Sequence, residues 1–478
     1  REDHLIRRAA IERIMRRRVS MSPTGKNEAE NILRELLWAR YFDNGSLDER
    51  DIVSVQHIID RFISLRTKLL TGRSSSNKAQ IADFLVELIT AEIEEFLTPI
   101  ESHREADFGY YIFQTLKEKV KIEDVSETQK DILLFIAIEK TYRKSDTAYL
   151  RYHVFSLLYK PLSQYSDAEL EQIVPKLPET FKKIDSLVAN PTVDRLVRFV
   201  RKQLPPFLIL FSVIREYKGD LVELLTSKSR LWARVEQIAR EKYAQVRSRL
   251  NVLAFRSLIY IFVTKMLFAL ILEVPVSQLI YNHVNYLAIG INSLAPPIFM
   301  LLIILTVSVP GENNTKRLFL RIIEIIDRDT TFEKTTAFIT KKVKSRRPIL
   351  AAGFTILYLS TFVVTLYLVH LGLGTVQFNF LSEALFVFFM SVVAFFAYRI
   401  KQIANMYRLT EKTGAFTPLV DFFFMPILSL GKIFSEGVSK INFFIVLFDV
   451  IIEAPFKLII EVIEEWISFV KQRKDEII

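Results

Sequence analysis

The chain has 478 residues, half of them hydrophobic and a quarter charged, with a formal net charge of +10. The complete absence of cysteine excludes disulfide bonds, thiolate metal sites and cysteine nucleophiles. Its 13 glycines are few against a usual share of roughly 7%, which disfavours phosphate-binding loops and the glycine-rich broken helices of transporters.

The N-terminal segment 1–19 combines an apolar stripe with many arginines, and it starts with Arg rather than Met, as a piece of a longer protein would. Such a basic segment can bind anionic lipid or nucleic acid. Nucleic acid is disfavoured because no aromatic platform accompanies the arginines. A solvated basic face is the simpler alternative. The candidates for contact with a lipid surface are Arg7, Arg8, Arg16, Arg17 and Arg18.

Residues 1–226 are predicted to form a multi-helix, all-α domain. Apolar residues in segments such as 52–70 and 81–97 recur at spacings of three and four, and alternating β-type runs are scarce. Asp48 with Asp51, and Ser166 with Glu169, have the spacing of capping boxes at helix starts.

A single long helix is predicted from about Ser227 through the first apolar run, because neither proline nor glycine occurs between Asp220 and Pro275. Residues 227–252 would then be a helical stalk leading into a membrane. A short break near residues 249–256 is the alternative.

Four apolar runs have the length needed to cross a hydrocarbon core. They cover approximately residues 253–272, 286–309, 349–371 and 380–397, within a predicted four-span membrane domain over residues 253–412. The connection 310–348 is rich in Lys and Arg, whereas 273–285 and 372–380 contain neither. The positive-inside rule therefore predicts a cytosolic loop at 310–348 and cytosolic N- and C-termini. The membrane itself is expected to be a plasma (inner) membrane. Further candidates for lipid-surface contact in this loop are Lys341, Lys342, Lys344, Arg346 and Arg347.

Ionisable and helix-breaking residues inside the spans are the candidate intramembrane functional residues. Lys265 lies near the middle of the first span and Glu383 in the fourth, so the two are expected either to pair structurally or to mark an ion path. Glu273 and His370 are expected at the outer headgroups. In the second span, Asn292 precedes Pro296 and Pro297, and these prolines are expected to kink the helix and free backbone carbonyls.

The tail 413–478 is apolar but interrupted by charges, which predicts interfacial amphipathic helices rather than a fifth span. An acidic stripe on this tail is predicted to contact protein, with a merely solvated stripe as the alternative. The stripe consists of Asp449, Glu453, Glu461 and Glu465.

Nothing in the sequence predicts catalysis, a metal site or a cofactor. The six histidines are scattered without a pair at metal-binding spacing or a neighbouring group of carboxylates. Adjacent acids such as Glu94 and Glu95 should diverge on a helix rather than converge on one substrate. No family motif is recognisable in the residues.

The sequence thus favours a noncatalytic multi-pass membrane protein whose helical cytosolic domain is a scaffold or docking platform for a cytosolic or membrane protein partner. The lipid bilayer is an expected partner, and a homo-oligomer is compatible with the pattern. The alternative is a small channel or transporter that uses the kinked second span and Lys265. A membrane enzyme with unrecognised catalytic residues is a third interpretation.

Overall fold

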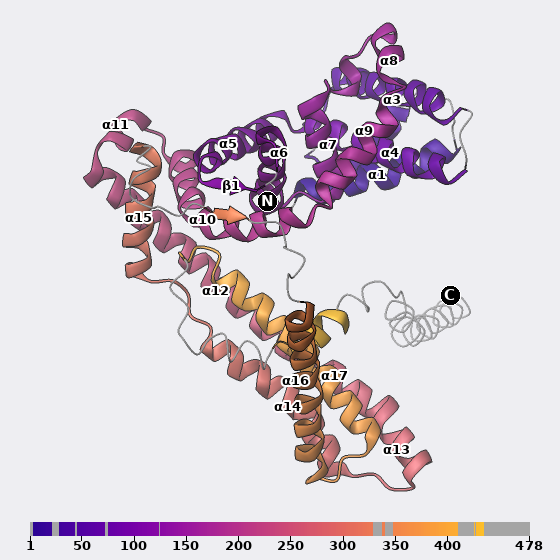
Figure 1. The fold of residues 1–478 in the computed structure, drawn as a ribbon, viewed down its shortest axis with the longest axis vertical. Helices are drawn as coiled ribbons and strands as arrows, with labels where there is room; N and C mark the ends of the chain where they lie inside the picture. Colours follow the sequence, from indigo (N-terminus) through magenta and orange to yellow (C-terminus); the bar gives the residue numbers. More distant parts are fainter. Residues whose placement is uncertain are drawn as a thin grey trace, which may run out of the picture. The chain divides into compact units, whose positions relative to one another are not determined.

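The computed structural model in Figure 1 describes residues 3–21, 28–43, 45–71, 75–123, 125–327, 337–339, 348–409, 425 and 427–434. Across these residues the fold is almost entirely helical, as predicted. The chain divides into two compact units. Unit 1 comprises Arg1–Ile238 and Asn314–Lys344, and unit 2 comprises Ala239–Asn313 and Ser345–Ile478.

Unit 1 is built around the helix α4, which contacts α1, α3, α7 and α9 (Figure 1). Apolar side chains of α4 such as Leu85 and Ile89 are fully buried, and Phe84 stacks on Phe181 of α9 with ring centroids 4.1 Å apart. The helices of the N-terminal part are α1 (Asp3–Met21), α2 (Glu28–Trp38), α3 (Glu49–Leu70), α4 (Ser75–Leu97), α5 (Pro99–Lys117), α6 (Glu127–Ile138), the π-helix η1 (Glu139–Arg143), α7 (Thr147–Leu158), the 3-10 helix η2 (Leu162–Gln164), α8 (Asp167–Ile173), α9 (Leu177–Val188), α10 (Pro191–Glu216) and α11 (Leu221–Thr226).

Both predicted capping boxes are present. The side chain of Asp48 accepts from the backbone N–H of Asp51, whose carboxylate accepts from the N–H of Asp48 at the start of α3. Ser166 and Glu169 make the same reciprocal bonds at the start of α8. These local bonds satisfy backbone donors that a helix start leaves open, which is why they can be recognised in sequence.

The segment between the second and third apolar runs folds into unit 1, which the sequence analysis did not anticipate. Its helix α15 (Glu312–Asp327) buries Leu318, Ile322 and Ile325, which share one face. Phe319 of α15 meets Trp232 edge to face at 5.0 Å, and the hydroxyl of Tyr111 donates to the carbonyl of Ile325 across 3.2 Å.

A short parallel strand pair is the exception to the all-helical prediction. The strand β2 (Ala337–Ile339) from the same segment pairs with β1 (Val120–Ile122), which lies between α5 and α6. Strands of three residues are too short to show the alternation by which a strand is recognised in sequence.

Unit 2 contains four helical stretches long and apolar enough to cross a membrane, Lys228–Ile280, Tyr286–Leu305, Thr355–Gly374 and Phe380–Ala404, the first of which begins in unit 1. The underlying elements are α12 (Lys228–Phe268), the π-helix η3 (Ala269–Glu273), α13 (Val274–Tyr281), α14 (Tyr286–Thr306), α16 (Pro348–Gly374) and α17 (Phe380–Ala404). The helix α12 is continuous, in agreement with the absence of proline and glycine there.

The helices of unit 2 expose apolar side chains as well as burying them. Along α16, Ile356, Val363 and Leu368 are more than half exposed, a pattern typical of a surface that faces lipid. The core forms where α14 packs beside α17 (Figure 1), around Met300 and Val393.

Candidate functional site

A buried cluster of four charged side chains lies in unit 1. His153 of α7 contacts two carboxylates, Glu139 through Nδ1 and Glu95 through Nε2, each at 2.8 Å. Arg143 donates to Glu95 across 3.0 Å and lies 3.7 Å from Glu139. The four groups come from α4, η1 and α7, so the cluster joins three elements.

The π-helix η1 positions two members of this cluster. Glu139 opens it and Arg143 closes it, and Lys144 then takes the left-handed conformation with φ of 59°. Ser145 donates to the carbonyl of Glu139 through its N–H and to the carboxylate through its hydroxyl. Single π-helical turns are rare and frequently lie at functional sites.

The cluster is charged but balanced. Burial alone would raise the pKa of Glu139 and of Glu95, but the charges and hydrogen bonds of His153 and Arg143 outweigh burial and hold both pKa values at about 2. Burial alone would lower the pKa of His153, but mainly Glu139 raises it to about 9. At neutral pH two cations therefore face two anions, and no member is a free base. Within the described residues no group of carboxylates and histidines is arranged to hold a metal ion.

The N-terminal arginines predicted to contact lipid form ion pairs with carboxylates of unit 1. Arg7 donates to Glu94 across 2.8 Å, and Arg8 pairs with Glu12 and Asp146 at 2.7 and 2.6 Å. The remaining arginines of the set are also paired. Arg16 pairs with Glu12 and Asp83, Arg17 with Glu35, and Arg18 with Glu28 and Glu35.

Arg7 and Arg8 are almost buried, whereas Arg16 and Arg17 keep about half of their side-chain surface exposed. Only the more exposed arginines have surface with which to reach lipid.

Glu94 also accepts from the hydroxyl of Tyr149 across 2.5 Å, so it belongs to a different hydrogen-bond network from Glu95, as expected for adjacent residues on a helix.

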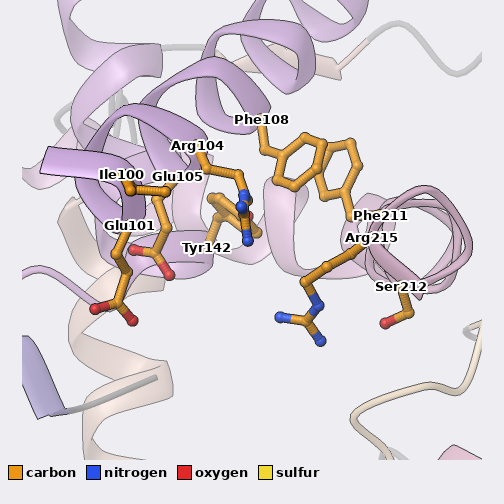
Figure 2. A pocket seen from close by; sticks show the side chains of 9 residues that line it. All are labelled: Ile100, Glu101, Arg104, Glu105, Phe108, Tyr142, Phe211, Ser212 and Arg215. Carbon is orange, nitrogen blue, oxygen red and sulfur yellow. The ribbon is translucent and has the colours of Figure 1, made fainter. Parts of the chain in front are cut away.

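Beside the charged cluster lies a pocket of about 300 Å³ (Figure 2). It is lined by Ile100, Glu101, Arg104, Glu105 and Phe108 of α5, Tyr142 of η1, and Phe211, Ser212 and Arg215 of α10. Phe108 and Phe211 stack with centroids 3.9 Å apart, and Tyr142 meets Phe211 edge to face. Figure 2 shows the guanidinium groups of Arg104 and Arg215 reaching toward the space between α5 and α10.

A second polar cluster is buried in unit 2. The ammonium of Lys265 lies 3.2 Å from the carboxylate of Glu273 and 5.0 Å from the ring centroid of Phe389. Glu273 also accepts from Asn292 across 2.8 Å and from the hydroxyl of Ser382 across 2.5 Å. The side chains of Lys265 and Glu273 have no exposed surface, so the cluster ties α12 and η3 to α14 and α17.

This cluster brings together some of the predicted intramembrane residues but not others. Lys265 and Asn292 meet through Glu273, which is fully buried and was not among the candidate residues from the sequence. Glu383 pairs with the exposed His370 at 2.9 Å, so its partner is not Lys265.

Pro296 and Pro297 lie inside α14, which continues as one helix to Thr306. The other predicted contact residues lie outside the described residues. They are Lys341, Lys342, Lys344, Arg346 and Arg347 of the loop, and Asp449, Glu453, Glu461 and Glu465 of the tail.

The π-helix η3 explains how Glu273 reaches Lys265. Eight residues along a regular helix would leave the two side chains about 80° apart around the axis. The wider turn of η3, which ends at Glu273, rotates that carboxylate back toward Lys265. The spacing of eight residues between two opposite charges was the only sequence signal for this pair.

No known protein family matches the chain, and no curated protein or solved structure is significantly similar to it.

Proposed function

We propose that the protein is a noncatalytic membrane-anchored docking platform, in which unit 1 is cytosolic and binds a protein partner at the plasma membrane. The observation that carries the proposal is the folding of α15 and β2, from the segment between two candidate spans, into unit 1. The excess of Lys and Arg in that segment supports a cytosolic side.

The consequence of this arrangement is that the chain passes between the two units three times, after Ile238, before Asn314 and after Lys344. A domain on one linker reorients freely, whereas each further connection restricts it. Three connections suit a platform, because they keep a binding surface at the membrane and raise the effective concentration of its partner there.

Unit 1 also exposes apolar side chains suited to protein contact. Ile100 and Tyr110 of α5 are 75% and 63% exposed. The balanced buried ion cluster behind α5 favours a fixed backbone rather than a chemical role, because each of its charges already has a partner.

Site-specific photo-crosslinking in native membranes tests the proposal. A photoreactive amino acid placed at Ile100 or Tyr110 should give a crosslink to the same partner protein, identified by mass spectrometry. The control position is Leu359 of α16, which is also more than half exposed but belongs to unit 2. Adducts only to lipid or to the protein itself from both unit 1 positions would contradict a docking role.

A channel or transporter is the second candidate function, favoured by one observation in unit 2. The amide oxygen of Asn292 is buried among the candidate spans without a hydrogen-bond partner, beside the Lys265 and Glu273 pair. Ion flux in liposomes that is abolished by Lys265→Leu, with the protein still inserted, would favour this function over the platform.

A further inference from the structure

The acidic and basic residues of the pocket between α5 and α10 differ in whether they already have a charged partner. Two of its four charged residues are carboxylates that already have partners: Glu101 accepts from Arg7 across 3.1 Å, and Glu105 lies 3.7 Å from Arg143. The two cations, Arg104 and Arg215, have no hydrogen bond or ion pair with any described residue. The charge left unpaired in the pocket is therefore positive.

Both unpaired guanidinium groups come from firmly held helices and approach one space (Figure 2). Guanidinium groups bind carboxylate and phosphate through paired, charge-assisted hydrogen bonds. Two guanidinium groups that line one pocket can both bind the same anionic group.

Besides its charged residues, the pocket is lined by three aromatic residues together with Ile100 and Ser212. Phe108 stacks on Phe211 at 3.9 Å, and Tyr142 lies edge to face with Phe211 at 5.8 Å. Flat apolar walls of this kind suit a planar ring. A volume of about 300 Å³ is at the small end of ligand pockets, so it suits one ring with one anionic group rather than a dinucleotide.

The pocket is also pre-formed by the buried ion cluster. Tyr142 is almost completely buried and lies in η1, directly before Arg143, which the carboxylates of Glu95 and Glu139 hold in place. A wall fixed in this way needs little ordering when a ligand enters, which favours binding.

We infer that the pocket lined by Arg104, Phe108, Tyr142, Phe211 and Arg215 binds a small anion that carries its carboxylate or phosphate on an aromatic ring. The inference goes beyond the docking function and does not depend on it. A bound anion would neutralise the two arginines, while its ring lies against the aromatic wall.

Calorimetric titration of the full chain in phosphatidylcholine nanodiscs tests the inference. The probes are phenyl phosphate and benzoate, with inorganic phosphate and benzyl alcohol as controls for the ring and for the charge. We expect saturable binding of phenyl phosphate or benzoate, at least about tenfold tighter than that of either control, because each control lacks one half of the recognition.

The variants Arg104→Ala and Arg215→Ala should each weaken this binding about tenfold or more. The matched control is Arg198→Ala, which removes an exposed arginine from the same helix as Arg215 but outside the pocket. Circular dichroism establishes that each variant is folded, and Arg215→Lys, which keeps the charge, should retain part of the affinity.

Three results would overturn the inference. The first is no saturable binding of either aromatic anion. The second is binding by the Arg104→Ala and Arg215→Ala variants as tight as that of the unchanged protein. The third is a loss on Arg198→Ala as large as the loss on Arg104→Ala or Arg215→Ala. Equally tight binding of inorganic phosphate and phenyl phosphate would overturn the aromatic part of the assignment.

Discussion

His153 and Glu139, fourteen residues apart in the chain, form an ion pair of 2.8 Å in the interior of unit 1. The folded environment raises the pKa of His153 from 6.5 to about 9, because the nearby carboxylates outweigh the cost of burial. His153 is therefore protonated at neutral pH and donates from both ring nitrogens, and its protonation is linked to folding.

The first prediction concerns alkaline pH. The folded state holds the His153 proton more tightly than the unfolded state, so the stabilisation is fully present below pH 6.5 and is lost as the pH rises toward about 9. The shift corresponds to about 3 kcal/mol in the free energy of unfolding. Thermal melts followed by circular dichroism should show this loss, and His153→Gln should remove it. His103→Gln, at an exposed position on α5, is the control and should leave the pH profile unchanged.

The second prediction concerns acidic pH and has the opposite sign. The pKa values of Glu95 and Glu139 are lowered from 4.5 to about 2, so their stabilisation is present above pH 4.5 and is lost as the pH falls toward 2. The contribution of this cluster to the stability of unit 1 should be largest between about pH 4.5 and 6.5. A stability maximum at pH 9 would contradict the first prediction, and unchanged stability between pH 4.5 and 2 would contradict the second.

The third prediction concerns removal of one buried anion. Glu139→Ala leaves Arg143 and His153 short of a partner and should cost about 3–5 kcal/mol in the free energy of unfolding. Glu223→Ala, which breaks an exposed pair with Arg230, should cost less than about 1 kcal/mol. Chemical denaturation compares the two variants, and similar costs would show that the buried cluster contributes little.

The fourth prediction concerns the polar cluster of unit 2. Lys265→Leu or Glu273→Leu alone strands a polar group among apolar helices and should lower the stability of the bundle by about 3 kcal/mol. The double substitution should recover most of that loss, because apolar replacements of both members of a buried pair are well tolerated. Melting temperatures in detergent give the double-mutant cycle, and strictly additive losses would exclude a coupled pair.

The fifth prediction concerns the attachment of α15 to unit 1. Leu318 is fully buried and Leu320 is 55% exposed, so the two positions form a matched pair on one helix. Leu318→Asp should release α15 and speed tryptic cleavage after Arg317 and Arg321, because a buried unpaired carboxylate is costly. Leu320→Asp should leave the cleavage rate near that of the unchanged protein.

The sequence was informative where the signal is local. The capping residues Asp48 and Ser166 and the unbroken run through α12 could be read directly, because each depends on neighbours within a few residues. The helix α15 had the same kind of signal in the spacing of Leu318, Ile322 and Ile325, but the charges around it led to its interpretation as a loop.

The two buried charged clusters could not be predicted from local sequence signals. Glu95 and His153 are 58 residues apart, and only the packing of α4 against α7 brings them together. The pairing of Lys265 with Glu273 depends on a π-helical turn for which the sequence has no recognised signature. Long-range packing and irregular turns therefore determine which side chains meet in these two clusters, and neither periodicity nor composition predicts them.

The most direct test of the docking platform is to remove unit 1 whole. Residues 1–238 would be deleted and residues 314–344 replaced by a short glycine-serine linker, since these two segments make up that unit. Crosslinked native membranes would then be compared with the full chain by mass spectrometry, with insertion of unit 2 verified. We expect a reproducible partner set that is lost with unit 1. Recovery of the same partners without unit 1, or of the full chain alone, would contradict it.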